Sequence, residues 1–293
     1  MKISIDETAG FCWGVVRTVE QVEKALEEKK NDNIYVLGDI IHNPREIERL
    51  AALGLKTITH DDFERIAPEK PLVIIRAHGE PPETYRKAEE LGIELMDATC
   101  PLVQQLQNRI NDKHKEGYDV VIFGKEKHAE VIGLRGVCND QCTVVSTKEE
   151  ALEKINVNRK TVLFSQTTMD KPTFFEISEV LEEKVKEKYG KNASDDYFQS
   201  KDTICKHVYG RIEDLEKFAE SNDVILFVAG KNSSNGKILY NVCKSKNERT
   251  YFIEDISEID TSLLKDAKTI GITGATSTPQ WFMEAVQEYL EKE

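Results

Sequence analysis

The sequence predicts an α/β protein made of three similar small domains with mostly parallel sheets. Short apolar runs rich in β-branched residues alternate with stretches of helical periodicity, which is typical of parallel sheets covered by helices. Cys12, Cys100 and Cys205 also divide the 293-residue chain into near-equal thirds, and each begins a similar pattern of two short polar loops. An internal repeat of this length indicates three related units around a common centre.

The predicted strands are short apolar runs, and amphipathic segments lie between them. The strands are Ile3–Ile5, Ile34–Leu37, Leu72–Ile75, Val120–Phe123, Thr143–Val145, Val162–Phe164, Val224–Val228 and Ile270–Ile272. Helical spacing joins Val15, Val19, Val22 and Leu26, then Leu102, Leu106 and Ile110, and more loosely Phe175, Val180 and Leu181. The polar stretch from Lys184 to Asp202 indicates a surface connection. We expect domains at 14–98, 99–199 and 200–293, with the N-terminal strand in 1–13 joined to the third.

The composition excludes several classes of function. A net charge of -13 leaves no basic excess to release phosphate counterions, so we expect neither nucleic acid nor an anionic membrane as a partner. The most apolar runs have strand length, and the N-terminus lacks the apolar core of a signal peptide. Six cysteines in such a chain indicate a reducing, cytoplasmic location, where cysteines are ligands, catalysts or core residues more often than disulfides.

The polar loops fall where a predicted strand ends and a helix begins, the edge at which open α/β sheets bind ligands. The first loops are His42-Asn43-Pro44, His128-Ala129-Glu130 and Ser233-Ser234-Asn235, and the second are Ala77-His78-Gly79, Gln166-Thr167-Thr168 and Ala275-Thr276-Ser277-Thr278-Pro279. Imidazole, hydroxyl and amide groups beside helix N-termini favour an anion such as phosphate. Arg76 and Lys231 are the only nearby cations, so hydrogen bonds rather than formal charges are expected to hold the anion.

The three repeated cysteines predict a metal centre. Cys12 and Cys100 each precede an amphipathic helix, a position that favours thiolate, and Pro101 suits a first helical residue. A structural zinc site takes four ligands, usually in C-x-x-C pairs, and the chain has no such pair. Three separated cysteines fit better a cubane cluster whose fourth iron is open to substrate. Cys138, Cys142 and Cys243 do not recur in the repeats, and we interpret them as structural or core residues.

Glu130 lies two residues after His128, where it is either a first-turn acid of the following helix or a proton relay beside the metal centre. The relay needs a pKa that burial has raised. Each serine or threonine of the loops is, taken singly, more often a helix cap than a ligand. Only their joint position in the repeat favours binding.

The motifs reached so far resemble the LytB-type 4-hydroxy-3-methylbut-2-enyl diphosphate reductase family, in order over nearly the whole chain. They are Gly10-Phe11-Cys12-Trp13-Gly14-Val15, Ile41-His42-Asn43-Pro44, Ala77-His78-Gly79, Asp97-Ala98-Thr99-Cys100-Pro101-Leu102-Val103, His128-Ala129-Glu130-Val131, Gln166-Thr167-Thr168, Asp202-Thr203-Ile204-Cys205 and Ser233-Ser234-Asn235. The Cys100 and Ser233 blocks are the most specific.

The resemblance implies the last step of the methylerythritol phosphate route to isoprenoids, an oxidoreductase reaction that removes the substrate hydroxyl and gives isopentenyl and dimethylallyl diphosphate. It also implies a trefoil fold around one 4Fe-4S cluster with an open fourth iron, and a ferredoxin- or flavodoxin-type electron donor. By the same resemblance, Cys12, Cys100 and Cys205 hold the cluster. Substrate contacts fall on His42, His78, His128, Thr167, Thr168, Ser233, Ser234, Asn235 and Ser277, with Glu130, Thr167 and His128 in the proton path.

The chain departs from the family pattern after Cys205. The stretch Lys206–Ile212 keeps the arginine, Arg211, but lacks the threonine and glutamine that usually follow this cysteine. Ala129 and Gly236 also replace a usual proline and serine. Two alternatives therefore stay open: a paralogue that uses the same pocket as a reductase or lyase on another small anion, and a non-enzymatic iron–sulfur redox sensor.

Overall fold

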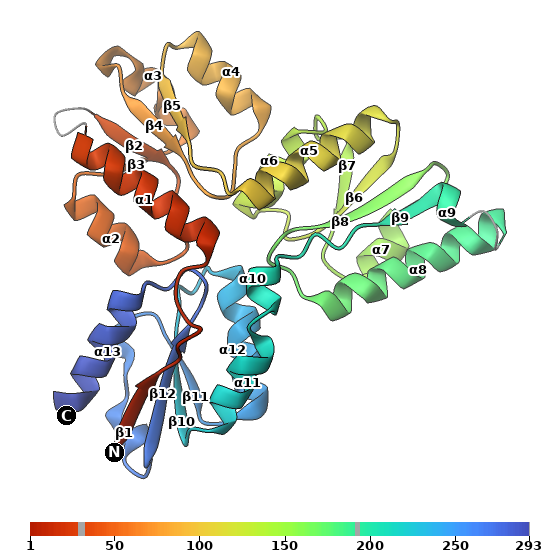
Figure 1. The fold of residues 1–293 in the computed structure, drawn as a ribbon. Helices are drawn as coiled ribbons and strands as arrows, with labels where there is room; N and C mark the ends of the chain where they lie inside the picture. Colours follow the sequence, from red (N-terminus) through yellow and green to blue (C-terminus); the bar gives the residue numbers. More distant parts are fainter. Residues whose placement is uncertain (29–32, 191–193, 293) are drawn as a thin grey trace. The chain divides into compact units, whose positions relative to one another are not determined.

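The computed structural model describes residues 1–28, 33–190 and 194–292. The chain divides into two compact units, residues 1–58 with 206–293 and residues 59–205, which are described separately. Three four-stranded sheets run in the orders β1-β12-β10-β11, β3-β2-β4-β5 and β7-β6-β8-β9. This arrangement agrees with the predicted α/β class (Figure 1).

The first unit contains two segments of the chain. In chain order its elements are β1 (Lys2–Ile5), α1 (Trp13–Glu28), β2 (Ile34–Leu37), α2 (Pro44–Ala52), β3 (Lys56–Ile58), α10 (Lys206–Tyr209), α11 (Ile212–Glu220), β10 (Val224–Val228), α12 (Ser234–Lys246), β11 (Thr250–Ile253), the 3-10 turns Ile256–Glu258 and Thr261–Leu264, β12 (Thr269–Gly274) and α13 (Gln280–Lys292). β1, at the start of the chain, pairs in parallel with β12, near its end.

The second unit is continuous in sequence. Its elements are the 3-10 turn His60–Asp62, α3 (Phe63–Ile66), the 3-10 turn Ala67–Glu69, β4 (Leu72–Ile75), α4 (Pro82–Glu90), β5 (Glu94–Asp97), α5 (Pro101–Lys115), β6 (Asp119–Phe123), α6 (Ala129–Gly136), β7 (Cys142–Val145), α7 (Lys148–Lys154), β8 (Thr161–Ser165), α8 (Lys171–Tyr189), α9 (Ser194–Tyr197) and β9 (Phe198–Ser200). The pairs β4–β5, β6–β7, β6–β8 and β8–β9 are all parallel.

Helices cover both faces of the sheets around β10 and β6. On one face of β10 and β12, Phe282, Met283 and Val286 of α13 pack against Leu226 and Ile272. Figure 1 shows α11 and α12 on the opposite face. The sheet around β6 is built in the same way, with α5 and α6 on one face and α8 on the other. Central strands are consequently buried on both sides and read as unbroken apolar runs.

Several sequence predictions need correction. Leu102 and Phe175 are exposed, and their neighbours Val103 and Phe174 face the core instead. The stretch from Lys184 to Asp202 is not a simple connection, because it contains the end of α8 together with α9 and β9, while residues 191–193 lie outside the described residues. Strands β3, β5, β9 and β11 were not predicted.

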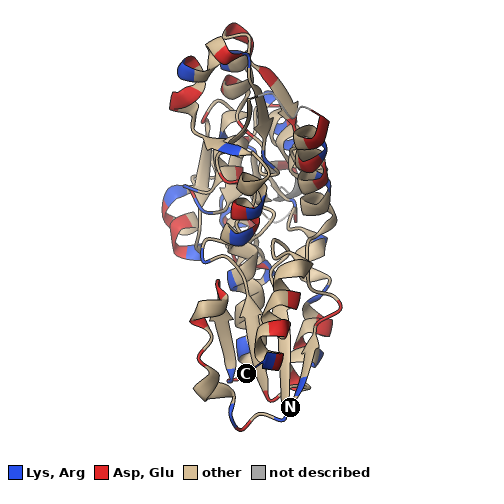
Figure 2. Cartoon of the chain, turned by 90° about the vertical axis from the view of Figure 1, so that its left-hand side faces the viewer, with Lys and Arg blue, Asp and Glu red and all other residues tan. Residues whose placement is uncertain are grey.

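Figure 2 shows Lys and Arg interspersed with Asp and Glu along the helices that face the viewer. Among the described residues, none of the helices combines the length and the apolar character that a membrane span needs. The three-domain boundaries at 14–98, 99–199 and 200–293 stay a prediction.

Candidate functional site

The first polar loop of the second unit places Glu130 inside the protein. His128 is the N-cap of α6, and its Nδ1 accepts a hydrogen bond from the Glu130 N–H at 3.2 Å. A neutral His128 ring therefore carries its proton on Nε2 and can donate from that atom. The Glu130 side chain does not cap the helix. It turns inward and is 1% exposed.

Glu130 is bound by one residue of the neighbouring loop. The Thr167 N–H donates to Glu130 Oε1 and the Thr167 hydroxyl to Oε2, both at 2.7 Å. Burial raises the pKa of Glu130 to about 7, while the two hydrogen bonds from Thr167 act in the opposite direction. The carboxyl group can therefore take up and release a proton near neutral pH.

Gln166 joins the two loops that carry these residues. Its Oε1 accepts from the Lys125 N–H at 3.1 Å, and its Nε2 donates to Thr168 Oγ1 at 2.8 Å. Gln166 is completely buried. The sequence placed it in a polar loop but gave it no role, because an amide that orients two backbone segments has no sequence signature.

His78 lies on a tight turn at the end of β4. Its ring meets that of His128 edge to face, with centroids 5.4 Å apart. The turn closes through the Gly79 N–H, which donates to the Arg76 carbonyl at 3.0 Å. Gly79 has a φ of +72°, and a Cβ there would come within 2.9 Å of Gln107 Nε2. Glycine is therefore required at this position.

The serine-rich loops of the first unit are also buried. Ser233, Ser234, Asn235 and Ser277 are each at most 8% exposed. Ser233 Oγ caps α12 by accepting from the Gly236 N–H at 3.1 Å and lies 3.4 Å from Ser277 Oγ. Asn235 Oδ1 accepts from the Thr276 N–H at 2.9 Å. Capping and clustering thus occur together, and the loops gather hydroxyl groups at a helix N-terminus, where anions are favoured.

His42 precedes α2 and lies against the end of β10. A Cβ on Gly230 would come within 2.3 Å of the His42 carbonyl oxygen, so only glycine allows this approach. Asn43 caps α2, since its Oδ1 accepts from the Glu46 N–H at 3.1 Å. The sequence prediction of a strand–helix junction at His42 is correct.

The three repeated cysteines share one local geometry. Each directly precedes a helix, and each is half-buried. Their amides donate to the second polar loops of their own sheets: Cys12 to the Thr276 carbonyl (3.1 Å), Cys100 to that of Ala77 (3.0 Å) and Cys205 to that of Thr167 (2.8 Å). Each cysteine is thus coupled to a polar loop of its own sheet. This loop precedes Cys100 and Cys205 in the sequence, whereas the loop that Cys12 contacts lies near the other end of the chain.

The donor chemistry fits an iron–sulfur cluster. All six cysteines lie in the described part of the chain, and none of them takes part in a disulfide bond. Cys12, Cys100 and Cys205 each lie directly before a helix, and cysteine thiolates are the ligands that hold iron–sulfur clusters. Cys138 and Cys243 are fully buried, as expected for core residues, and Cys142 packs beside Cys138.

The two candidate cations are already paired. Arg76 Nη2 lies 3.4 Å from Glu80 Oε1, and Lys231 Nζ forms ion pairs with Glu254 and Glu258. The hydrogen-bonding loops are consequently better suited than these cations to hold an anion.

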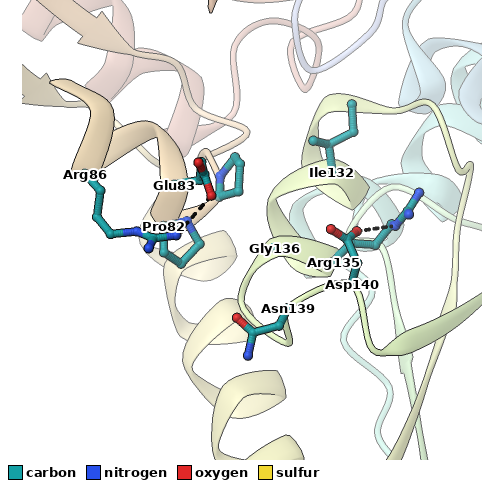
Figure 3. Close-up of a pocket in the computed structure, with 9 residues that line it drawn as sticks. Pro82, Glu83, Arg86, Ile132, Arg135, Gly136, Asn139 and Asp140 are labelled. Carbon is teal, nitrogen blue, oxygen red and sulfur yellow. Dashed lines mark hydrogen bonds and ion pairs between the residues drawn. The ribbon is translucent and has the colours of Figure 1, made fainter.

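A cavity of about 600 Å³ in the second unit is lined by residues that follow two of these loops in the sequence, among them Pro82 of α4 and Ile132 of α6 (Figure 3). Its charged walls are internally paired, Arg86 with Glu83 and Arg135 with Asp140, both at 3.0 Å. Among the described residues, none of the predicted site residues lines it.

Comparisons with known proteins identify the family of the chain. The family model described as LytB protein matches residues 3–291. The chain is 45% identical to the 4-hydroxy-3-methylbut-2-enyl diphosphate reductase of Chloroherpeton thalassium, covering 99% of this chain and 96% of that protein. It is 44% identical to the protein of the same name from Bacteroides thetaiotaomicron, with 99% and 98% covered.

Two solved structures share the fold. One is a structure of (E)-4-hydroxy-3-methyl-but-2-enyl diphosphate reductase, described as the terminal enzyme of the non-mevalonate pathway. It is 34% identical, covers 100% of this chain and 99% of its own, and has a TM-score of 0.70. The other is the E-1-hydroxy-2-methyl-but-2-enyl-4-diphosphate reductase of Plasmodium falciparum, 27% identical with a TM-score of 0.83, covering 99% and 87%. The predicted α/β fold class is confirmed.

Proposed function

This chain belongs to the LytB family, and from that premise we propose that it reduces 4-hydroxy-3-methylbut-2-enyl diphosphate to isopentenyl and dimethylallyl diphosphate. The observation that carries the proposal is the buried pair of Glu130 and Thr167, whose acid titrates near neutral pH. A protein that only sensed oxidants would have no need of such an acid. The reaction needs one, because the leaving hydroxyl must be protonated to depart as water.

In this proposal Cys12, Cys100 and Cys205 hold one 4Fe-4S cluster with an open fourth iron. The cluster would supply two electrons from a ferredoxin- or flavodoxin-type donor, together with Lewis acidity toward the substrate oxygen. The diphosphate is held by His42, His78, His128, Thr168, Ser233, Ser234, Asn235 and Ser277. This assignment is supported by two observations: the serine loops are buried, and helices begin at these loops, where backbone N–H groups favour an anion.

The hydrogen bonds of Glu130 define which oxygen carries the proton. Oε1 accepts from a backbone N–H, which cannot accept in return, so the acid form holds its proton on Oε2. The partner of Oε2 is the Thr167 hydroxyl, which can accept this proton and donate its own. Thr167 therefore extends the reach of an acid that is almost completely shielded from water.

His128 contributes a second donor. Because its Nδ1 accepts from the Glu130 N–H, a neutral ring carries its proton on Nε2, and this N–H is the group that donates to a phosphate oxygen in the proposal. The same hydrogen bond connects the His128 ring to the backbone of Glu130. Substrate binding and proton delivery thus depend on one helix N-terminus.

The test is an anaerobic assay of the chain reconstituted with iron and sulfide. The allylic alcohol diphosphate is added with a reduced viologen dye, and dye oxidation is followed together with the two isomeric diphosphate products. Oxidation with both products formed supports the proposal. A cluster-loaded protein that oxidises no dye would instead favour a paralogue acting on another small anion, an alternative to which the altered stretch after Cys205 points.

A further inference from the structure

Arg211 and Asp6 form a buried ion pair that the proposed mechanism does not use. Asp6 follows β1 and is 4% exposed, and Arg211 is the N-cap residue of α11 and is 7% exposed. Arg211 Nη2 lies 2.9 Å from Asp6 Oδ2, and Nη1 donates to the Gly274 carbonyl at 3.0 Å. Thr273 Oγ1 adds a hydrogen bond to Asp6 Oδ2 at 2.7 Å. One guanidinium therefore joins two segments that are far apart in sequence.

Both joined segments lead directly into the candidate site. Asp6 Oδ1 accepts from the Thr8 N–H at 2.9 Å and from its hydroxyl at 2.8 Å, which turns the chain toward Cys12. Gly274 is the last residue of β12 and precedes the loop of Thr276, whose carbonyl accepts from the Cys12 N–H at 3.1 Å. The ion pair thus fixes the two strand ends between which Cys12 is held.

The same turn recurs before the other two repeated cysteines. Asp97 Oδ1 accepts from the Thr99 N–H at 2.9 Å, and Asp202 Oδ1 accepts from the Ile204 N–H at 3.0 Å. In each sheet an aspartate at or just after the end of an edge strand uses one oxygen to turn the chain into the cysteine segment, as Asp6 does. This recurrence indicates that the turn serves the cysteines rather than one local fold.

The second oxygen distinguishes Asp6 from its two counterparts. Asp97 Oδ2 accepts from the Tyr85 hydroxyl at 3.0 Å, and Asp202 Oδ2 pairs with Lys171 Nζ at 3.1 Å, where both side chains are about one-third exposed. Only Asp6 among the three has a buried cation. Its cysteine is six residues away, whereas the other two lie three residues from theirs. The longer segment between Asp6 and Cys12 has more conformational freedom, so a stronger contact is needed to restrain it.

We propose that Arg211 and Asp6 are positioning residues that hold Cys12 and the Ser277 loop in the geometry the proposed reaction requires. The expected change in turnover rests on the proposed function. The expected change in the spectrum of the cluster rests only on the three cysteines as its ligands. It also gives a role to the arginine that survives in the altered stretch after Cys205. Substitution of residues that hold metal ligands in place typically lowers metal affinity or activity about 10- to 100-fold.

The experiment compares R211M with K171M in the reconstituted protein of 293 residues. R211M breaks the buried pair, and K171M breaks the partly exposed pair that Lys171 forms with Asp202. We measure iron per chain, the electron paramagnetic resonance spectrum of the reduced protein, kcat, KM for the allylic diphosphate, and the unfolding temperature. We expect R211M to lower kcat per loaded chain about 10- to 100-fold, raise KM and change the spectrum. K171M should stay within about twofold of the parent, since ion pairs that solvent reaches contribute little.

R211K and T273V keep the inference testable if R211M does not fold. R211K retains a charge for Asp6 but cannot also serve Gly274, so an intermediate kcat is expected. T273V removes one hydrogen bond to Asp6 and should change the spectrum and kcat in the same direction by less. A lowered unfolding temperature with an unchanged spectrum and an unchanged kcat per loaded chain, in whichever of these variants folds, would overturn the inference. If the parent protein loads iron but turns over no substrate, the proposed function fails, and the spectra alone decide the role of Arg211.

Discussion

Replacing Glu130 by glutamine tests the proton relay most directly. The amide oxygen can still accept from the Thr167 N–H, and the amide NH₂ can donate to the Thr167 hydroxyl, so both contacts of the buried side chain are retained. Only the proton is lost. Removal of a general acid costs about 100- to 10,000-fold in rate, and we expect E130Q to lower kcat by that amount with little change in KM.

The same substitution has a stability signature whose sign can be worked out. Burial raises the pKa of Glu130 from 4.5 to about 7, so between these values the folded protein keeps a proton that the unfolded chain releases. The contribution is fully present below pH 4.5 and is lost as the pH rises through 7. At 1.36 kcal/mol per pKa unit, the loss is about 3 kcal/mol. The uncharged side chain of E130Q does not titrate, so this loss is absent from the variant. Relative to the parent, the free energy of unfolding of E130Q should therefore rise by up to about 3 kcal/mol between pH 4.5 and 8.

Two assays are needed, anaerobic turnover of the loaded protein from pH 6 to 9 and denaturant unfolding over the same range extended to pH 4.5. The parent should lose activity above pH 7, where the acid form of Glu130 disappears. Glu126, whose side chain is 70% exposed, supplies the control: E126Q should match the parent in both assays. Turnover within about tenfold of the parent, with an unchanged pH profile in E130Q, would show that Glu130 does not deliver the proton.

Three further substitutions test other parts of the site. T167V removes the hydroxyl that lowers the pKa of Glu130, so the pH above which activity declines should move upward. Because the proton relay is broken, kcat should also fall about 10- to 100-fold. A pH–rate profile measures both effects. C100S should abolish full cluster loading, measured as iron and sulfide per chain. G230A places a Cβ within 2.3 Å of the His42 carbonyl oxygen, and because that atom belongs to the backbone we expect a loss of about 3 kcal/mol in the free energy of unfolding.

Each of these has a result that would count against it. The pH limit should not move in T168V, because Thr168 contacts Gln166 rather than Glu130. An unmoved limit in T167V as well would contradict the assigned hydrogen bond. C142S should load iron fully, since Cys142 is a partly buried residue that packs beside Cys138. Full loading of C100S would remove Cys100 from the ligand set. Unchanged stability in G230A would mean that the His42 loop can move away.

How much of the fold the sequence predicts depends on the place of a strand in its sheet. All six central strands, such as β2, β4 and β10, were predicted, because burial on both faces requires an unbroken apolar run. The four missed strands are all sheet edges. β5, for example, leaves both of its ends exposed, so its sequence carries no such run.

The positions of the polar loops were equally readable. A strand that ends in polar residues before a helix locates a loop at the carboxyl edge of a sheet, and His42, His128 and Ser233 lie at such junctions. The sequence alone could not show where the side chains of these loops point. Glu130 had two open interpretations, and only the packing of β6 beside β8 brings its carboxyl group to Thr167, 37 residues further along the chain.

The sequence by itself determined the fold class, the three cysteine positions and the residue types at the loops, because periodicity and local turn chemistry are properties of neighbouring residues. The tertiary structure decided which distant groups meet. Arg211 contacts Asp6, 205 positions away in the chain, because β1 pairs with β12. The pKa of Glu130 is raised because two loops bury its carboxyl group. Both effects depend on burial, and burial is set by the whole fold rather than by any local stretch of residues.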